Sequence, residues 1–158
     1  MAGGAAGRAG VRALLQRTTG ASVAVAGEVI GSIDSGLVVL LGVGPGDDET
    51  SADALARRIT ELRIFRDADG RTNSSLIEIE GAVLLVSQFT LFADTRRGRR
   101  PGFTGAAPPE LAERLYERAV ASLRALGVTV ETGRFGEEMT VQLTNDGPFT
   151  IWLDTDDR

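Results

Sequence analysis

The sequence contains no cysteine and no histidine, and every one of its 17 cationic side chains is arginine. Without cysteine, the chain forms no disulfide and no thiolate zinc site. Without histidine, it has no Ser-His-Asp triad and no side chain whose ordinary pKa lies near neutrality. Any enzyme chemistry must therefore use hydroxyls, carboxylates, guanidinium groups, backbone dipoles or groups that the substrate brings.

Aromatic residues are also scarce, at 5% of the 158 residues, so valine, leucine and isoleucine must fill most of the core. No apolar run approaches the ~20 residues of a membrane helix, and we expect no membrane partner. The net charge of −5 argues against a generally basic nucleic-acid-binding surface, so such binding needs a local patch. No cluster of acidic residues predicts a magnesium site, and we expect no metal and no cofactor.

The first ten residues, MAGGAAGRAG, lack the apolar segment of a secretory signal. We therefore expect residues 1–10 to be a disordered leader, residues 11–158 to form a single domain, and the protein to be cytoplasmic. A sharper hypothesis is that Val11, read from a GTG codon, is the natural start. Detection of residues 1–10 in the endogenous protein by mass spectrometry would contradict it.

Short apolar stretches alternate with glycine-containing turns along most of the chain. Residues 36–43 are a continuous apolar run typical of a buried central strand, and residues 82–89, which begin with the apolar run AVLLV, are predicted to be the next buried strand. Residues 48–62 and 109–126 carry apolar side chains at helical spacing, which predicts two amphipathic helices. Further strands are predicted over 12–17, 21–26, 28–33, 128–131, 140–143 and 150–153, with Gly20 at the first turn. The order predicts a mixed α/β fold, with layered or barrel-like sheets and two main helices.

Polar residues follow directly at the end of the second buried run. Ser87, Gln88, Phe89 and Thr90 come after Val86. Strand alternation predicts Ser87 and Phe89 on one face, and Gln88 and Thr90 on the other. A buried glutamine amide without partners costs roughly 1–3 kcal/mol, so Gln88 should bond locally or face a polar ligand. Two interpretations stay open: a strand that simply meets water, and a catalytic strand end.

Two further segments each have an ordinary and a functional interpretation. Arg96, Arg97, Arg99 and Arg100 form either a solvated charge run or a phosphate-binding loop, since guanidinium groups suit phosphate geometry. The segment NDGPFT, residues 145–150, is an ordinary hairpin turn or a binding feature in which Gly147-Pro148 is a candidate cis peptide.

The combination of SQFTLFADTRRGRRPGF with TNDGPFTIWLD resembles the D-aminoacyl-tRNA deacylases. The segments VRALLQRTTGASVAVAGEVIGSI, PPELAERLYERAV and ETGRFGEEMTVQL match that family in the same order and spacing. The resemblance runs from about Val11 to Asp154 and includes two intact motifs, SQxT and NxGPxT. Val11 falls where the family usually begins with methionine, which agrees with the hypothesis about the start.

The resemblance implies an editing enzyme that hydrolyses the ester between a D-amino acid and the terminal adenosine of tRNA. It also implies that glycine mischarged on tRNA-Ala is cleaved, whereas L-aminoacyl-tRNA is spared. The expected partners are aminoacyl-tRNA and a second copy of the chain, in a homodimer whose Gly147-Pro148 segment enters the partner's active site. There, backbone carbonyls hold the substrate ammonium and leave no room for an L side chain.

The same resemblance assigns roles to individual residues. The catalytic and adenosine side of the pocket is expected to consist of Ser87, Gln88, Phe89 and Thr90. The substrate-binding residues and chiral filter are expected to be Gly147, Pro148, Asn145, Phe135, Met139 and Arg17. Within this second set, Phe135 and Met139 match positions near the terminal adenosine, and Arg17 braces the site.

The mechanism must agree with the missing histidine and cysteine. Thr90 is a possible nucleophile, but no obvious base can activate it. We expect instead that backbone N–H groups, such as that of Phe89, stabilise the oxyanion while the 2′-hydroxyl of the tRNA ribose assists water. The alternatives are a non-catalytic dimeric module that binds RNA or nucleotides on the same scaffold, and a metal-dependent hydrolase.

Overall fold

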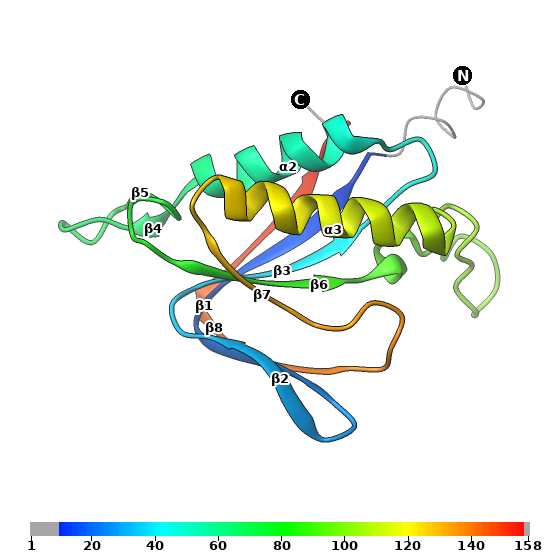
Figure 1. Ribbon diagram of the computed structural model, residues 1–158, viewed down its shortest axis with the longest axis horizontal. Helices are drawn as coiled ribbons and strands as arrows, with labels where there is room; N and C mark the ends of the chain where they lie inside the picture. The colour runs from blue at the N-terminus through cyan, green and yellow to red at the C-terminus, as the bar shows by residue number, and fades with distance from the viewer. Residues whose placement is uncertain (1–9, 157–158) are drawn as a thin grey trace.

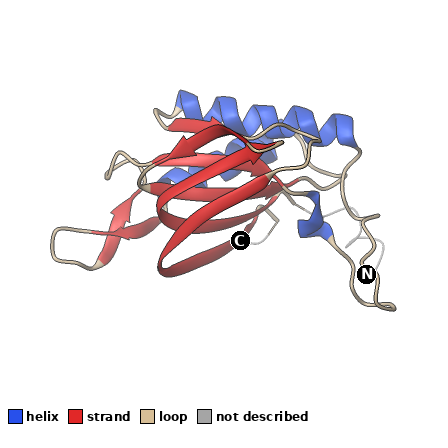
Figure 2. Cartoon of the chain, turned by 90° about the horizontal axis from the view of Figure 1, so that it is seen from below, coloured by secondary structure: helices blue, strands red, loops and turns tan. Residues whose placement is uncertain are grey.

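The structure, a computed structural model, describes residues 10–156. The expected leader therefore lies, apart from Gly10, outside the described residues. Both long helices pack on one face of a strongly curved sheet (Figure 1). A small hairpin lies at one end of the molecule, while a short 3-10 helix and the loop after it lie at the opposite end (Figure 2).

The main sheet is six-stranded, in the order β2-β1-β3-β6-β7, with β8 paired to β1. Its strands are β1 (Arg12–Val25), β2 (Glu28–Ile33), β3 (Gly36–Gly42), β6 (Ala82–Ser87), β7 (Thr129–Thr132) and β8 (Thr140–Asp154). The central strands β3 and β6 are parallel, as are β6 and β7, whereas β1 is antiparallel to each of its neighbours. The mixed α/β, barrel-like fold predicted from the sequence is confirmed.

Two hydrophobic clusters lie on the two faces of this sheet. The larger lies between the sheet and the helices and includes Leu15, Leu41 and Leu85. The smaller lies on the opposite face and includes Val38 and Leu84. It is enclosed because β2 curls toward β7, where a Cβ on Gly31 would lie 2.9 Å from the carbonyl oxygen of Thr132. The close approach nearly closes the sheet into a barrel.

The two helices begin and end close to the residues predicted from the sequence. Helix α2 spans Glu49–Glu61, and the side chain of Asp48 caps it by accepting a hydrogen bond from the backbone N–H of Ser51. Helix α3 spans Pro109–Ala125. Gly127 follows it with a φ of 92°, a left-handed conformation that favours glycine after a helix.

The predicted turn at Gly20 is wrong. Residues 12–25 form one strand, because β8 pairs with β1 on both sides of Gly20. The pairing runs from Arg12 with Asp154 to Ala24 with Thr140. Gly20 lies at a register shift within this pairing. The strands predicted at 140–143 and 150–153 are likewise parts of the single strand β8.

Two other local predictions also differ from the structure. The sequence pattern missed the antiparallel hairpin of β4 (Arg63–Arg66) and β5 (Thr72–Ser75), whose strands are joined by residues 67–71. Strand β6 ends at Ser87, and the chain turns into the 3-10 helix η1 (Phe89–Phe92). The prediction that Ser87 and Phe89 share a strand face is therefore wrong. Across the described residues, no helix has the length and apolar character needed to span a bilayer.

Candidate active site

A cavity of about 670 Å³ opens beside the ends of β3 and β6, below the first turn of α3. One wall comes from the residues that follow β6, and another from the segment between β7 and β8. Gly42 and Val43 continue the wall at the end of β3. The parallel pairing of β3 and β6 brings these strand ends together, as parallel pairing generally does in α/β sheets.

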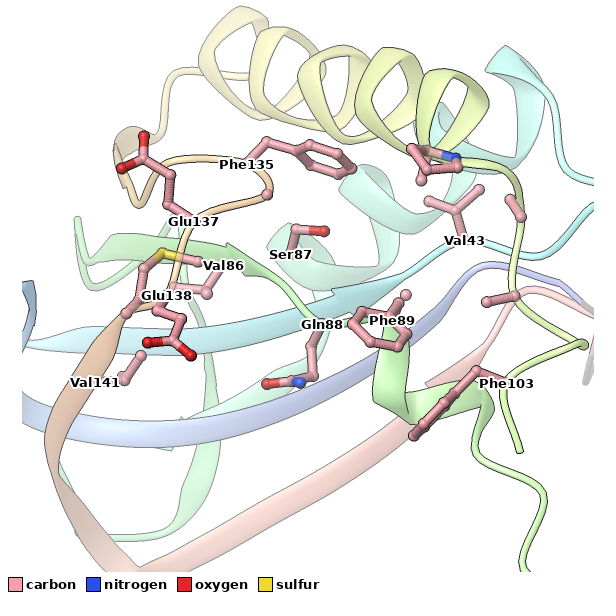
Figure 3. Close-up of a pocket in the computed structure, with 17 residues that line it drawn as sticks. Val43, Val86, Ser87, Gln88, Phe89, Phe103, Phe135, Glu137, Glu138 and Val141 are labelled. Atoms are coloured by element: carbon pink, nitrogen blue, oxygen red, sulfur yellow. The ribbon is translucent and has the colours of Figure 1, made fainter. Parts of the chain in front are cut away.

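Three residues of the SQFT motif line this cavity, namely Ser87, Gln88 and Phe89. The Ser87 hydroxyl points into the cavity (Figure 3). Thr90 is exposed and does not line the cavity; its Oγ1 accepts a hydrogen bond from Gln88 Nε2. Gln88 thus has a local partner. The cavity beside this strand end agrees with the catalytic interpretation.

The backbone at this strand end is held close to β3. Gln88 N donates to the carbonyl oxygen of Leu41 at 2.7 Å. A Cβ on Gly42 would lie only 3.0 Å from the Gln88 carbonyl oxygen, so glycine permits this approach. Among residues 10–156, the backbone N–H groups of Phe89 and Thr90 make no hydrogen bond. The N–H of Phe89 is therefore an available donor at the cavity wall, and the N–H of Thr90 is a second one directly beside it along the chain.

Aromatic rings frame the cavity and its mouth. Phe135 points into it (Figure 3), and Met139 is also part of its lining. Phe89 and Phe103, which are 55% and 37% exposed, meet edge-to-face with ring centroids 5.0 Å apart. Behind Phe135, Tyr116 Oη donates to the carbonyl oxygen of Leu85 at 2.7 Å. Burial raises the pKa of Tyr116 to about 12, so this phenol stays protonated and is no general base at neutral pH.

Sequence reasoning missed several residues of the cavity. Phe103, Glu137 and Glu138 all line it, as does Gly42. The Glu138 carboxylate is directed toward Gln88, whereas Glu137 points away from the cavity (Figure 3). The sequence signal for the acidic pair was its position between Phe135 and Met139. Within residues 10–156, no group of three or more acidic side chains is arranged to hold a metal ion.

The NDGPFT segment lies inside β8 and is not a hairpin turn, so that interpretation is wrong. The register with β1 passes from Thr18–Asn145 to Gln16–Thr150, which leaves residues 146–149 as a bulge. Asn145 spans the bulge, because its Oδ1 accepts from Phe149 N at 2.9 Å and its Nδ2 donates to Thr150 Oγ1 at 2.9 Å. The Gly147-Pro148 peptide is cis, and both residues are exposed.

Arg17 lies behind this bulge and is only 5% exposed. Its Nε donates to the Asp146 carbonyl oxygen at 3.1 Å and its Nη1 to the Ile64 carbonyl oxygen at 2.8 Å. Its guanidinium carbon lies 4.5 Å from the centre of the Phe149 ring. Burial lowers the pKa of Arg17, and the nearby charge of Arg66 lowers it further, while Asp146 opposes both.

The structure therefore divides the predicted site residues into two groups. Ser87, Gln88, Phe89, Phe135 and Met139 come together around the cavity. The second group, which we call the bulge group, comprises Arg17, Asn145, Gly147 and Pro148. None of these residues lines the cavity of the same chain. The bulge group is instead held together by Arg17 and by the Asn145 side chain.

The predicted arginine cluster lies in a loop beside Phe103. The loop is closed at its base by paired backbone hydrogen bonds between Asp94 and Gly102, at 2.7 and 2.9 Å. Arg96 is bound by Asp94 through two contacts of 2.8 Å. Within the described residues, the other three make no ion pair; we call them the loop arginines, and they are Arg97, Arg99 and Arg100.

Comparison with known proteins identifies the family to which these motifs belong. Residues 14–154 match the sequence profile of the family described as D-Tyr-tRNA(Tyr) deacylase. The chain belongs to this family. The D-aminoacyl-tRNA deacylase of Dinoroseobacter shibae is 59% identical over 144 residues, which cover 91% of this chain and 99% of that protein. The family resemblance seen in the sequence motifs is confirmed.

Solved structures of related chains have the same fold. One, described as c-Myc DNA Unwinding Element Binding Protein, is 38% identical with a TM-score of 0.84, and the match covers 90% of this chain and 97% of that one. Another, described as a probable eukaryotic D-amino acid tRNA deacylase, has a TM-score of 0.82 over 91% of this chain and 98% of that one. At 18% identity, the second similarity concerns the fold alone.

Proposed function

We propose that the protein is a D-aminoacyl-tRNA deacylase, which hydrolyses the ester between a D-amino acid and the terminal ribose of tRNA. The observation that carries this proposal is the cavity formed by the SQFT motif in a chain that belongs to the deacylase family. The N–H groups of Phe89 and Thr90, which bond to no acceptor among residues 10–156, are the donors that we propose for the ester carbonyl. The expected cytoplasmic location follows from this substrate.

The apolar part of the cavity suits the terminal adenosine. Phe135 and Met139 provide surfaces for a flat base, since aromatic and thioether groups pack well on π systems. The volume of about 670 Å³ is within the range of small-molecule sites, which is about 300–1,000 Å³. The Ser87 hydroxyl and Gln88 amide then lie on the polar side, where the ribose and the ester would sit.

Hydrolysis at this site requires few groups from the protein. Water attacks the ester carbonyl carbon, and the N–H groups of Phe89 and Thr90 stabilise the oxyanion. The bond from the carbonyl carbon to the ribose oxygen then breaks, and the leaving ribose oxygen takes a proton, so that free amino acid and tRNA result. The substrate's 2′-hydroxyl assists the proton transfers. Each oxyanion donor is worth about 3–4 kcal/mol, or 10²–10³ in rate.

Thr90 has a positioning role in this scheme. Its hydroxyl oxygen accepts from the Gln88 amide and makes no hydrogen bond to a carboxylate among residues 10–156, so it is poorly suited as a nucleophile. We expect Thr90→Ala to keep substantial deacylation, whereas a substrate with hydrogen in place of the 2′-hydroxyl should react very slowly. A folded but inactive Thr90→Ala variant, or a trapped covalent adduct on Thr90, would contradict the RNA-assisted mechanism.

Chiral selection is proposed to come from a second copy of the chain. The exposed Gly147-Pro148 segment does not line its own cavity, so it is available to enter a partner's cavity. There, its backbone carbonyls would bind the ammonium group, and an L side chain would collide with the segment. Glycine has no side chain to exclude, so glycyl-tRNA-Ala is expected to be a substrate too.

The sheet face without helices offers a surface for this homodimer. Leu14 pairs with Leu40 on one side and with Trp152 on the other, so the three side chains share one face. Trp152 is 46% exposed, and the two leucines are half-buried. An apolar patch across three neighbouring strands is typical of a surface that a partner covers.

The decisive experiment compares purified protein on D- and L-tyrosyl-tRNA, with EDTA present. Rapid release of D-tyrosine alone supports the proposal, and activity in EDTA removes the metal-dependent alternative. Tight tRNA binding without release of either amino acid would support the non-catalytic module instead. That alternative has some support from the nucleic-acid-binding description of the relative that is 38% identical.

A further inference from the structure

Asp146, the first residue of the bulge, lies between two arginines from different parts of the fold. Arg66 in β4 binds its carboxylate with both terminal nitrogens, at 2.8 and 3.3 Å. Buried Arg17 approaches the same carboxylate at 3.4 Å and bonds to the Asp146 carbonyl oxygen. The side chain and backbone of the residue before Gly147 are therefore both held from outside β8.

The hairpin that carries Arg66 is itself tightly organised. The Asp67 carboxylate accepts from the backbone N–H groups of Asp69 and Arg71 and from Asn73 Nδ2, at 2.9, 3.0 and 3.0 Å. Arg17 Nη1 also bonds to the Ile64 carbonyl oxygen in the same hairpin. Arg66 is thus presented by a rigid element and not by a loose loop.

Few other contacts restrain the tip of the bulge. Gly147 and Pro148 are exposed. Besides the bonds to Asp146, the described side-chain contacts across the bulge are the two Asn145 bonds, to Phe149 and Thr150, and the Phe149 ring on Arg17. A segment with so few contacts would be mobile without outside support. The bidentate ion pair from Arg66 to Asp146 supplies such support at the end of the bulge that Asn145 does not reach.

We propose that Arg66 is a positioning residue, through which the β4–β5 hairpin holds the Gly147-Pro148 segment in the orientation that discriminates D from L substrates. The inference rests on the proposed deacylation. The inference goes beyond the proposed deacylation because it makes D/L discrimination depend on an ion pair outside the chain's own cavity. Neither Arg66 nor Asp146 lines that cavity.

The chain contains a closely matched control pair. Arg118 binds Asp53 with two contacts of 2.8 Å, and its side-chain exposures of 48% and 29% match the 50% and 27% of Arg66 and Asp146. That pair links the helices α2 and α3 and is not part of the cavity lining. Since exposed ion pairs contribute little to global stability, R66A and R118A should unfold at similar temperatures.

The test compares R66A, R66K and R118A on D- and L-tyrosyl-tRNA. We expect R66A to lower kcat on the D substrate by about fivefold, the scale of one partly exposed ion pair, and to make L cleavage measurable. R66K should restore part of the discrimination, and R118A should behave as wild type. If R66A matches R118A in kcat and in the D/L ratio, the inference is overturned.

Two further readouts separate positioning from other roles. A rise in KM alone for R66A would make Arg66 a tRNA contact and overturn the inference. Hydrogen exchange at the Phe149 amide, which needs no substrate, should be faster in R66A than in R118A, and equal rates would also overturn it. A wild-type protein that cleaves no D-aminoacyl-tRNA would overturn the proposed function, whereas an active wild type beside an unaffected R66A overturns only this inference.

Discussion

Replacement of Gly147 by alanine tests the part of the site on which chiral selection depends. Gly147 has a φ of 131°, a conformation that L residues rarely adopt. A Cβ there would lie 3.0 Å from Arg17 Nη2, 3.2 Å from Phe149 N and 3.3 Å from Phe149 Cβ. Both the backbone and the surroundings therefore oppose the substitution.

The loss of stability in Gly147→Ala depends on whether the bulge or the Arg17 side chain moves to make room for the new methyl group. Unfavourable backbone dihedral angles cost about 1–3 kcal/mol. Arg17 is bonded to two carbonyl oxygens, and loss of a hydrogen bond to a charged group costs about 1.5–3 kcal/mol. The exposed bulge should therefore move, while Arg17 stays. We expect Gly147→Ala to lose about 1–2 kcal/mol of stability, because movement relieves part of the strain.

The functional loss should be larger than the loss of stability. A misplacement of about 1 Å can cost 10²-fold in rate, so kcat/KM on D-tyrosyl-tRNA should fall roughly 10- to 100-fold, and the D/L ratio should fall with it. Deacylation of both substrates and thermal unfolding measure the two effects. Gly127→Ala is the control, because Gly127 has a φ of 92° with no heavy atom near its added Cβ. Full rate and discrimination in Gly147→Ala, or equal losses in Gly127→Ala, would refute this reasoning.

Three further predictions concern other parts of the chain. Burial raises the pKa of Asp47 to about 6, so its folded form binds a proton more strongly than the unfolded chain, and stability should fall as pH rises from about 4 to 6. Asp47→Asn should flatten that slope in pH-dependent denaturation and stabilise the protein at pH 7 by about 1–3 kcal/mol, and an unchanged slope would contradict this. Gly42→Ala should displace the Gln88 carbonyl, lower kcat more than it raises KM, and cost about 1–3 kcal/mol of stability. An unchanged kcat would refute the idea that the close contact between Gly42 and Gln88 matters for catalysis. Neutralising the loop arginines should make the slope of log K for tRNA binding against log salt concentration shallower, by about 0.7–0.9 for each phosphate that they neutralise in the wild type. Neutralising Arg96, which Asp94 already binds, should change this slope less. An unchanged slope would mean that the loop is only solvated.

The elements whose signals are local could be located from the sequence. Apolar periodicity and start and stop residues located both helices, because a helix is specified by neighbours within a few positions. Continuous apolar runs located β3 and β6, and the polar residues after β6 correctly marked one wall of the cavity. Motif spacing also identified the family, which the match over residues 14–154 confirmed.

The pairing of distant segments became visible only in the folded chain. Gly20 and the NDGP sequence are typical turn signals, yet both lie within long strands because β1 and β8 pair with each other along most of their length. Such pairing depends on residues more than 100 positions apart, and local propensity cannot encode it. For the same reason, the burial of Arg17 and the bond from Arg66 to Asp146 could not be predicted from either segment alone.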